Sequence, residues 1–370
     1  MNTVSRWSTR PAIRAASEPR HAAPRGAAWW LVLAGLLGAP AAAQALGRED
    51  FIALGGSVLK IEVLRRQGGY SLGSGVVVAP GRVVTNCHVT RDGVGIEVLR
   101  HGQRWPVAAQ QADLHHDLCL LQVPGIGADA VARIGRAAGL QLAQPVHAVG
   151  FTGGLGLQAS DGSVVALHRV DGAPVIRSSN WFTSGASGGG LFDAQRRLVG
   201  ILTFRLRGGA AHYYAAPVEW VQALLDRAGA EGAGAMPVAP IPGGEPAFWQ
   251  APAAAQPAFL RADALLRDGR WAELAQVAAA WIAEDPRDPQ AWLARARADD
   301  EQGRAAAAQA GYERALALDA RLAEAWLRLG LLQQRAGALA EARAALRALQ
   351  PLDDAMAAQL AEGLGADAPR

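Results

Sequence analysis

The sequence is poor in cysteine, almost devoid of lysine, and has no long apolar run. Two cysteines in 370 residues exclude a disulfide-dense scaffold and a zinc site of four thiolates. Lysine occurs once, at Lys60, so arginine supplies 35 of the 36 basic residues. No apolar stretch reaches the roughly 20 residues that span a bilayer. A hydrophobic fraction of 51% still predicts a folded chain, long enough for two domains.

The first 43 residues differ from the rest in charge. They hold five arginines and one acidic residue, while the whole chain has a net charge of +3, so the remainder is close to neutral. A near-neutral chain lacks a basic footprint, and no nucleic-acid partner is expected. An apolar run over 26–39 and three alanines at 41–43 complete the pattern of a signal peptide. We expect a signal peptide over 1–43 and a periplasmic or secreted protein of bacterial type; an uncleaved membrane anchor is the alternative.

Residues 46–228 have the pattern of an all-β domain. Short β-rich runs alternate with glycine-containing turns at even spacing, which is typical of a barrel or sandwich. The predicted strands are Ser57–Leu64, Gly75–Ala79, Arg82–Thr85, Gly95–Leu99, Leu118–Val123, Val146–Val149, Gly162–Leu167 and Leu198–Thr203. A helix is expected over 217–227, where apolar residues share one face. Residues 229–256, rich in alanine, proline and glycine, predict a linker.

Residues 257–365 form a helical region with an internal period. Gly269, Gly303 and Gly337 are spaced 34 residues apart, as are Trp292 and Trp326. This is the length of a tetratricopeptide repeat. We expect three repeats, at about 256–289, 290–323 and 324–357, which bind a protein partner and are separable from the β domain. Unrelated alanine-rich helices are the alternative.

Three motifs in the β region present a histidine, an aspartate and a serine in that order. They are Gly73-Ser74-Gly75 leading into Thr85-Asn86-Cys87-His88-Val89, then Asp117-Leu118-Cys119-Leu120-Leu121, then Gly185-Ala186-Ser187-Gly188-Gly189. With these motifs the chain resembles chymotrypsin-fold serine proteases, most closely the HtrA-like branch, over about residues 52–228. The resemblance implies an all-β double-barrel trypsin-like protease domain, here followed by an all-α tetratricopeptide-repeat domain.

The resemblance implies a serine endopeptidase that acts on peptides or proteins without a cofactor. A serine hydroxyl is a weak nucleophile, so an imidazole must take its proton and a carboxylate must orient the imidazole. Ser187, His88 and Asp117 fit these roles. The backbone N–H groups of Gly185 and Ser187 would form the oxyanion hole.

Several alternatives compete with this interpretation. The serine motif also fits the nucleophile elbow of α/β-hydrolases, but the order His, Asp, Ser favours the chymotrypsin fold. Ser184 lacks the glycine frame of a nucleophile. His115 and His116 beside Asp117 could suggest a metal, but no third ligand has typical spacing, so no metal is expected. Ala186 stands where relatives often carry Asp or Asn, and no PDZ domain is recognisable. A catalytically silent binding or scaffold protein is therefore the rival hypothesis.

The resemblance also implies a substrate pocket and a disulfide. The pocket would be lined by Phe182, Thr203, Phe204, His212 and Tyr214. Bulky walls without a carboxylate predict a preference for small or medium aliphatic residues before the scissile bond. The segments carrying Cys87 and Cys119 run side by side in the resembling fold, and an oxidising compartment would favour a disulfide between them. Two packed free thiols are the alternative.

Overall fold

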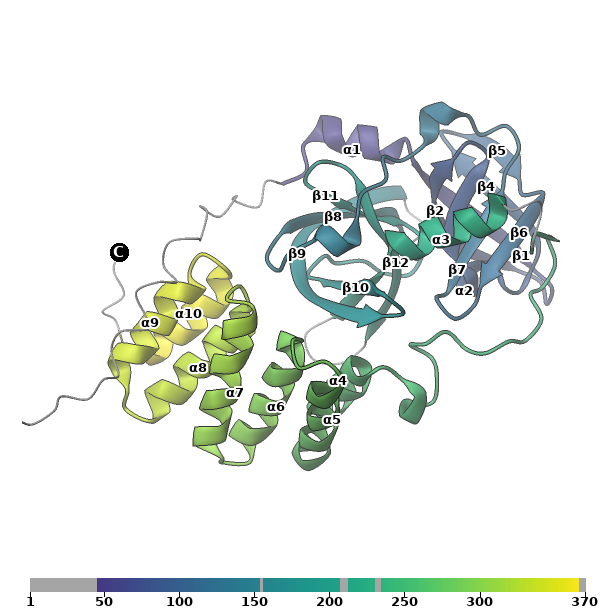
Figure 1. Cartoon of the computed structure of the whole chain (residues 1–370). Coiled ribbons are helices and arrows are strands. Elements are labelled where there is room, and N and C mark those ends of the chain that lie inside the picture. Colours follow the sequence, from purple (N-terminus) through teal and green to yellow (C-terminus); the bar gives the residue numbers. More distant parts are fainter. Residues whose placement is uncertain (1–44, 154–155, 207–211, 230–233, 366–370) are drawn as a thin grey trace, which may run out of the picture. The chain divides into compact units, whose positions relative to one another are not determined.

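The computed structural model describes residues 45–153, 156–206, 212–229 and 234–365 (Figure 1). The predicted signal peptide, and with it the alternative of a membrane anchor, lies outside these residues. Across the ranges that are described, no helix is long and apolar enough to cross a membrane. The elements from α1 (Arg48–Gly55) to α10 (Asp354–Gly363) belong to one compact unit.

An antiparallel eight-stranded sheet makes up the first half of the β domain. Its strand order is β14-β6-β7-β3-β2-β1-β4-β5. The bounds are β1 Val58–Arg65, β2 Tyr70–Ala79, β3 Arg82–Asn86, β4 Gly93–Arg100, β5 Gln103–Pro106, β6 Ala109–Asp113, β7 Leu118–Gln122 and β14 Met236–Pro237. The one-turn helix α2 (Cys87–Thr90) follows β3. Alternate residues of β1 are buried because successive side chains of a strand face opposite sides.

This sheet differs from the expected first barrel. In the described part of the chain no strand pairing joins its edge strands, β14 and β5. β14 comes from the predicted linker and pairs with β6 through Met236 opposite Gln110. The edge that the β region alone would expose is therefore covered by a segment from beyond it.

The second half of the β domain is a closed six-stranded barrel. Its strand order is β10-β13-β12-β11-β8-β9. The bounds are β8 Pro145–Thr152, β9 Gly156–Val170, β10 Ala173–Ser178, β11 Gly190–Asp193, β12 Leu198–Leu206 and β13 His212–Pro217. The long strand β9 pairs with both β8 and β10. The helix α3 (Val218–Gly229) follows the last strand and buries Val218, Trp220, Val221 and Leu224.

The C-terminal region is a series of helix pairs with a 34-residue period (Figure 1). The bounds are α4 Ala258–Arg267, α5 Trp271–Glu284, α6 Pro289–Glu301, α7 Ala305–Leu318, α8 Ala323–Arg335 and α9 Leu339–Leu349. Gly269, Gly303 and Gly337 follow the first helix of each pair with φ of 65°, 74° and 77°, a conformation that glycine adopts without steric cost. The indole N–H groups of Trp292 and Trp326 donate to carbonyls six residues upstream at 3.0 and 2.8 Å.

The helices share a buried interface with the closed barrel. The Tyr214 hydroxyl donates to Asp263 Oδ2 of α4 at 2.5 Å, and burial with the nearby Asp263 charge raises the pKa of Tyr214 well above its usual value. The His168 ring of β9 stacks on Phe259 of α4 with centroids 4.1 Å apart. Tyr214 and Phe259 belong to one buried cluster that contains residues of the barrel and of the helices, a contact that the predicted loose linker did not indicate.

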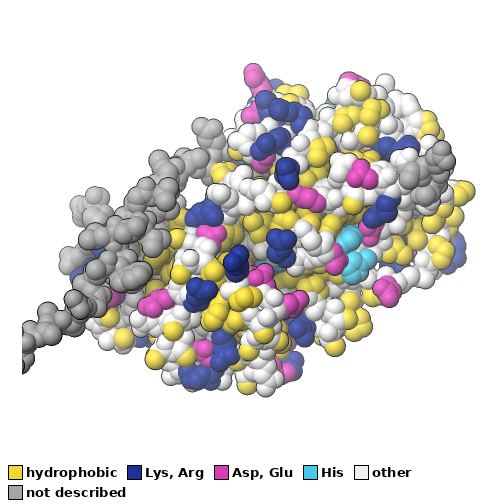
Figure 2. Space-filling model, viewed as in Figure 1, with side chains coloured by type: hydrophobic (Ala, Val, Ile, Leu, Met, Phe, Trp, Pro, Cys, Tyr) yellow, Lys and Arg dark blue, Asp and Glu magenta, His cyan; other side chains and the backbone are white. Residues whose placement is uncertain are grey.

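Charges of both signs are mixed on the surface. On the face drawn in Figure 2, arginine side chains lie among aspartate and glutamate side chains. Such mixing agrees with a near-neutral chain.

The buried helix cap Asp288 predicts a pH dependence of stability. Asp288 accepts the Gln290 N–H at 2.8 Å at the start of α6, and burial raises its pKa to about 6. A raised folded-state pKa means that the contribution to stability is present below about pH 4 and is lost as pH rises through about 6. Asn keeps the cap without titrating. We expect Asp288→Asn to raise the free energy of unfolding by up to about 3 kcal/mol at pH 7. The melting temperature of this variant should depend less on pH between pH 4 and 7.

Thermal unfolding of the full chain from pH 4 to 8 measures this effect. Asp353→Asn is the matched control, because Asp353 caps α10 by accepting the Met356 N–H at 2.9 Å. Identical pH profiles for the two variants would contradict the assignment to Asp288.

Candidate active site

His88 and Asp117 form the best-defined pair of the site. β3 pairs with β7 so that Asn86 lies opposite Leu118, which sets α2 beside the residue that precedes β7. His88 Nδ1 is 2.6 Å from Asp117 Oδ2, and the His88 backbone N–H donates to Asp117 Oδ1 at 2.8 Å. Asp117 is 3% exposed and has a positive φ of 56°. Both carboxylate oxygens therefore hold one histidine in a fixed orientation.

Asn86 connects this pair to the barrel. Its fully buried Nδ2 donates to the Asp117 carbonyl at 3.0 Å and to Thr203 Oγ1 of β12 at 3.2 Å. The Thr203 hydroxyl in turn donates to the Ile201 carbonyl at 2.8 Å. The Asp117 carbonyl and the barrel strand β12 are thus held by the same Asn86 amide.

Ser187 lies in the loop between β10 and β11, and its main chain is fixed to the first sheet. The Ser74 N–H of β2 donates to the Ser187 carbonyl at 2.8 Å, while Ser74 Oγ donates to the Gly185 carbonyl at 2.7 Å. Gly188 has φ of 85°, and a Cβ there would lie 2.1 Å from the Ser74 carbonyl oxygen. Only glycine fits so close to the neighbouring strand.

The structure brings Ser187 to the junction that holds His88. Thr85, three residues before His88, donates through Oγ1 to the Ser74 carbonyl at 2.7 Å. Among the described side chains, no hydrogen bond joins Ser187 Oγ to His88. Among the backbone hydrogen bonds of the described ranges, none has the Gly185 or the Ser187 N–H as its donor.

The predicted pocket residues face different neighbours. Thr203 contacts Asn86, Phe204 stacks on Tyr214 with centroids 4.7 Å apart, and the Phe182 ring lies 4.8 Å from Tyr213. The register of β12 against β13 shifts between Leu202 and Phe204. The side chain of His212 lies outside the described residues. Of the other four, Phe182 lines the cavity described next, whereas Thr203, Phe204 and Tyr214 are not among the residues of its walls.

A small cavity lies beside Phe182, in front of the Ser187 loop. Its walls come from β8, β9, β12 and the loop, and include Gly150, Trp181, Phe182, Ala186 and Leu202. No charged side chain is among them. The cavity could hold a short uncharged side chain.

Cys87 and Cys119 form a disulfide. The Sγ atoms are 2.11 Å apart and the Cα atoms 4.9 Å apart. The bond joins the residue before His88 to the strand that follows Asp117. Ile241 covers it from the segment beyond α3.

The segment 236–250, which we name the strap, contacts the site although its composition predicts a loose linker. The Ile241 N–H donates to the Arg91 carbonyl at 2.7 Å, and the Phe248 N–H donates to the His115 carbonyl at 3.0 Å. The Trp249 ring stacks on Phe204 at 4.8 Å and meets the His88 ring edge-on at 6.1 Å. The pair Phe248-Trp249, the only adjacent aromatics between 229 and 256, is the sequence signal that could have indicated this packing.

His115 and His116 both contact the carboxylate of Asp171, which sequence spacing did not indicate. Asp117 is taken up by His88, whereas Asp171, from the turn between β9 and β10, lies within hydrogen-bond distance of both imidazoles. These three residues lie beside the candidate catalytic residues and are not part of them.

Among known proteins, the family model of the trypsin-like peptidase domain matches residues 73–201. Human serine protease HTRA4 is 28% identical over 166 residues, covering 41% of this chain and 34% of that protein. A probable serine protease do-like of Buchnera aphidicola is 30% identical over 142 residues. The match covers 36% of this chain and 30% of the Buchnera protein. The chain spans about a third of the length of these relatives.

Solved structures of proteases align with about half of the chain. The HtrA-type protease AlgW with tripeptide aligns with a TM-score of 0.45 and 24% identity, covering 49% of this chain and 64% of AlgW. The active form of the Rv3671c protease of M. tuberculosis aligns with a TM-score of 0.46 and 22% identity. The alignment covers 51% of this chain and 88% of the Rv3671c chain.

Removal of Trp249 should expose His88. The side chain of His88 is 29% exposed beside the indole. We expect Trp249→Ala to speed the modification of His88 by diethyl pyrocarbonate several-fold, because the reagent must reach the ring. Peptide mapping by mass spectrometry gives the rate at His88 separately from the other histidines. Trp181→Ala is the control, since this indole is 55% exposed and outside the strap. Equal rates in both variants would show that the strap does not cover His88.

Proposed function

We propose that this chain is an exported serine endopeptidase that hydrolyses peptide bonds with Ser187, His88 and Asp117 and needs no cofactor. The observation that carries the proposal is the 2.6 Å contact between His88 Nδ1 and Asp117 Oδ2, formed next to a glycine-framed serine loop. The trypsin-like peptidase domain and the similarity to serine proteases support the reaction class. Export is inferred from the arginine-rich and apolar segments of residues 1–43.

In the proposed reaction, Ser187 Oγ attacks the carbonyl carbon of the scissile bond while His88 Nε2 takes its proton. Asp117 accepts the Nδ1–H of His88, which fixes the tautomer and stabilises the imidazolium. The Gly185 and Ser187 N–H groups stabilise the oxyanion. The imidazolium then protonates the leaving amine. Water, deprotonated by His88, releases the acyl group and restores Ser187.

The uncharged cavity beside Phe182 supports a preference for small or medium aliphatic residues before the scissile bond. Its walls hold no carboxylate that could pair with arginine or lysine. AlgW was solved with a tripeptide, which suits the proposal of a peptide substrate here.

We further propose that the helix pairs are tetratricopeptide repeats that bind a protein partner. The support is the 34-residue period of the helices and of the glycines with positive φ. Because Asp263 and Phe259 are occupied by the barrel, the partner would bind helix faces that these contacts leave open.

A catalytically silent binding protein is the second candidate. It is favoured by one observation, that Ser187 Oγ makes no hydrogen bond to His88 among the described side chains. Catalytic hydrogen bonds are often loose in the absence of substrate, so this geometry is compatible with both functions.

Hydrolysis of a peptide library distinguishes the two functions. We expect the full chain to cleave after small or medium aliphatic residues, and Ser187→Ala to lose about 10⁴-fold or more in kcat/KM, because nucleophile and base act as one unit. The control is Ser184→Ala, which removes an exposed hydroxyl in the same loop. Wild-type rates in Ser187→Ala would contradict the assignment of the nucleophile. A folded wild-type chain without activity would favour the silent binding protein, and cleavage mainly after arginine or lysine would contradict the specificity.

A further inference from the structure

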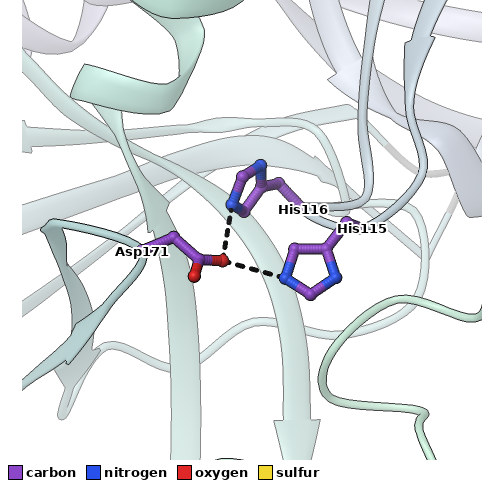
Figure 3. A group of neighbouring side chains, drawn as sticks. All are labelled: His115, His116 and Asp171. Carbon is purple, nitrogen blue, oxygen red and sulfur yellow. Dashed lines mark hydrogen bonds and ion pairs between the residues drawn. The ribbon is translucent and has the colours of Figure 1, made fainter.

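His115, His116 and Asp171 meet where a turn of the first sheet touches a hairpin of the barrel (Figure 3). The two histidines lie in the turn between β6 and β7, and Asp171 lies in the turn between β9 and β10. Asp171 Oδ2 is 2.8 Å from His115 Nε2 and 3.1 Å from His116 Nε2. Imidazole atoms reach the surface beside acidic side chains on the face drawn in Figure 2. The three side chains thus direct their ligand atoms to one point.

Both ring nitrogens of His116 face carboxylates, Nδ1 that of Asp113 and Nε2 that of Asp171. Its Nδ1 is 3.0 Å from Asp113 Oδ2, and a neutral imidazole has a single N–H. When that N–H serves Asp113, His116 Nε2 and Asp171 Oδ2 are both acceptors at 3.1 Å. In that tautomer, a cation held between Nε2 and Oδ2 would accept a lone pair from each.

The surroundings of His116 are those of a supported metal ligand. A carboxylate behind the ligating imidazole fixes the ring and increases its basicity. Asp113 has this position, and Arg227 holds it through an ion pair of 2.6 Å. The His116 ring also stacks on Trp220 with centroids 3.9 Å apart, and its side chain is 15% exposed. His116 is therefore fixed before any ion binds.

The distances require only small movements of exposed groups. Ligand atoms about 2.1 Å from a tetrahedral zinc ion lie about 3.4 Å apart. The present distances to Asp171 Oδ2 are shorter by about half an ångström on this scale. The side chains of His115 and Asp171 are 49% and 51% exposed, so both can turn outward around an ion held by His116.

We propose that His115, His116 and Asp171 form a binding site for one divalent transition-metal ion, with Zn²⁺ the best fit. Two imidazoles and one carboxylate are ligands that zinc accepts, and the exposure of the site leaves the fourth position to water. The ion would join the first sheet to the barrel. It would also fix His115, whose carbonyl holds the Phe248 N–H of the strap, next to Trp249 and His88.

Zinc titration of the full chain carrying Ser187→Ala tests this site apart from the proposed proteolysis. Calorimetry should show one saturable Zn²⁺ site, and zinc should raise the melting temperature. His115→Ala and Asp171→Asn should each weaken binding at least about tenfold, as one of three ligands is lost. Asn suits the positive φ of 47° at position 171, so this variant should fold.

Two further variants in the same background serve as controls. His101→Asn removes an imidazole from the turn between β4 and β5 and should bind zinc like the parent. Absence of saturable binding in the parent would overturn the proposal, as would equal affinities for His115→Ala, Asp171→Asn and His101→Asn. Binding that is lost with His88→Ala and kept with His115→Ala would place the ion at His88 and overturn it too.

Discussion

The hydrogen bond from the Ser74 N–H to the Ser187 carbonyl joins the two halves of the β domain, and the candidate site depends on it. Ser74 is fully buried, and its hydroxyl accepts the Phe151 N–H at 2.8 Å while donating to Gly185. Sliding one half against the other would leave these buried groups unpaired, at about 1–3 kcal/mol each. His88 and Asp117 belong to the sheet and the Ser187 loop to the barrel, so their mutual position is set by this junction.

The C-terminal half of the chain supports the same junction. The strap supplies an edge strand to the sheet, covers the disulfide with Ile241 and sets Trp249 against His88. α4 is then joined to the barrel by the hydrogen bond from Tyr214 of β13 to Asp263. A β domain cut off after α3 would lose all of these contacts. The proposed protease therefore depends on residues far outside the 73–201 match.

The parts of the structure that the sequence predicts are those set by local pattern. The pattern predicts a strand over Ser57–Leu64, and β1 runs Val58–Arg65. The spacing of three glycines predicts the turns between helices, because each needs a residue that tolerates positive φ. The resemblance to chymotrypsin-fold proteases predicts that His88 and Asp117 lie close together. It could be recognised because each of its motifs is a short contiguous stretch of sequence.

The parts that the sequence does not predict depend on contacts between distant segments. Asp171 joins His116 only because a hairpin turn 55 residues later reaches the same place. Composition cannot reveal that Trp249, in a stretch of proline and glycine, packs on Phe204. Phe204 stacks on Tyr214 and Phe182 lies against Tyr213, and these contacts depend on how β12, β13 and the Ser187 loop pack together. These features arise from tertiary packing, which no local pattern encodes.

In the proposed enzyme, residues from both halves of the β domain form one catalytic centre, and chemical labelling of the serine can detect it. A fluorophosphonate reacts with a serine whose hydroxyl is activated by a neighbouring base. We expect one label per chain, located on Ser187 by mass spectrometry and lost in a folded His88→Ala variant. An unlabelled folded wild-type chain, or labelling of Ser187 that does not change in His88→Ala, would contradict it.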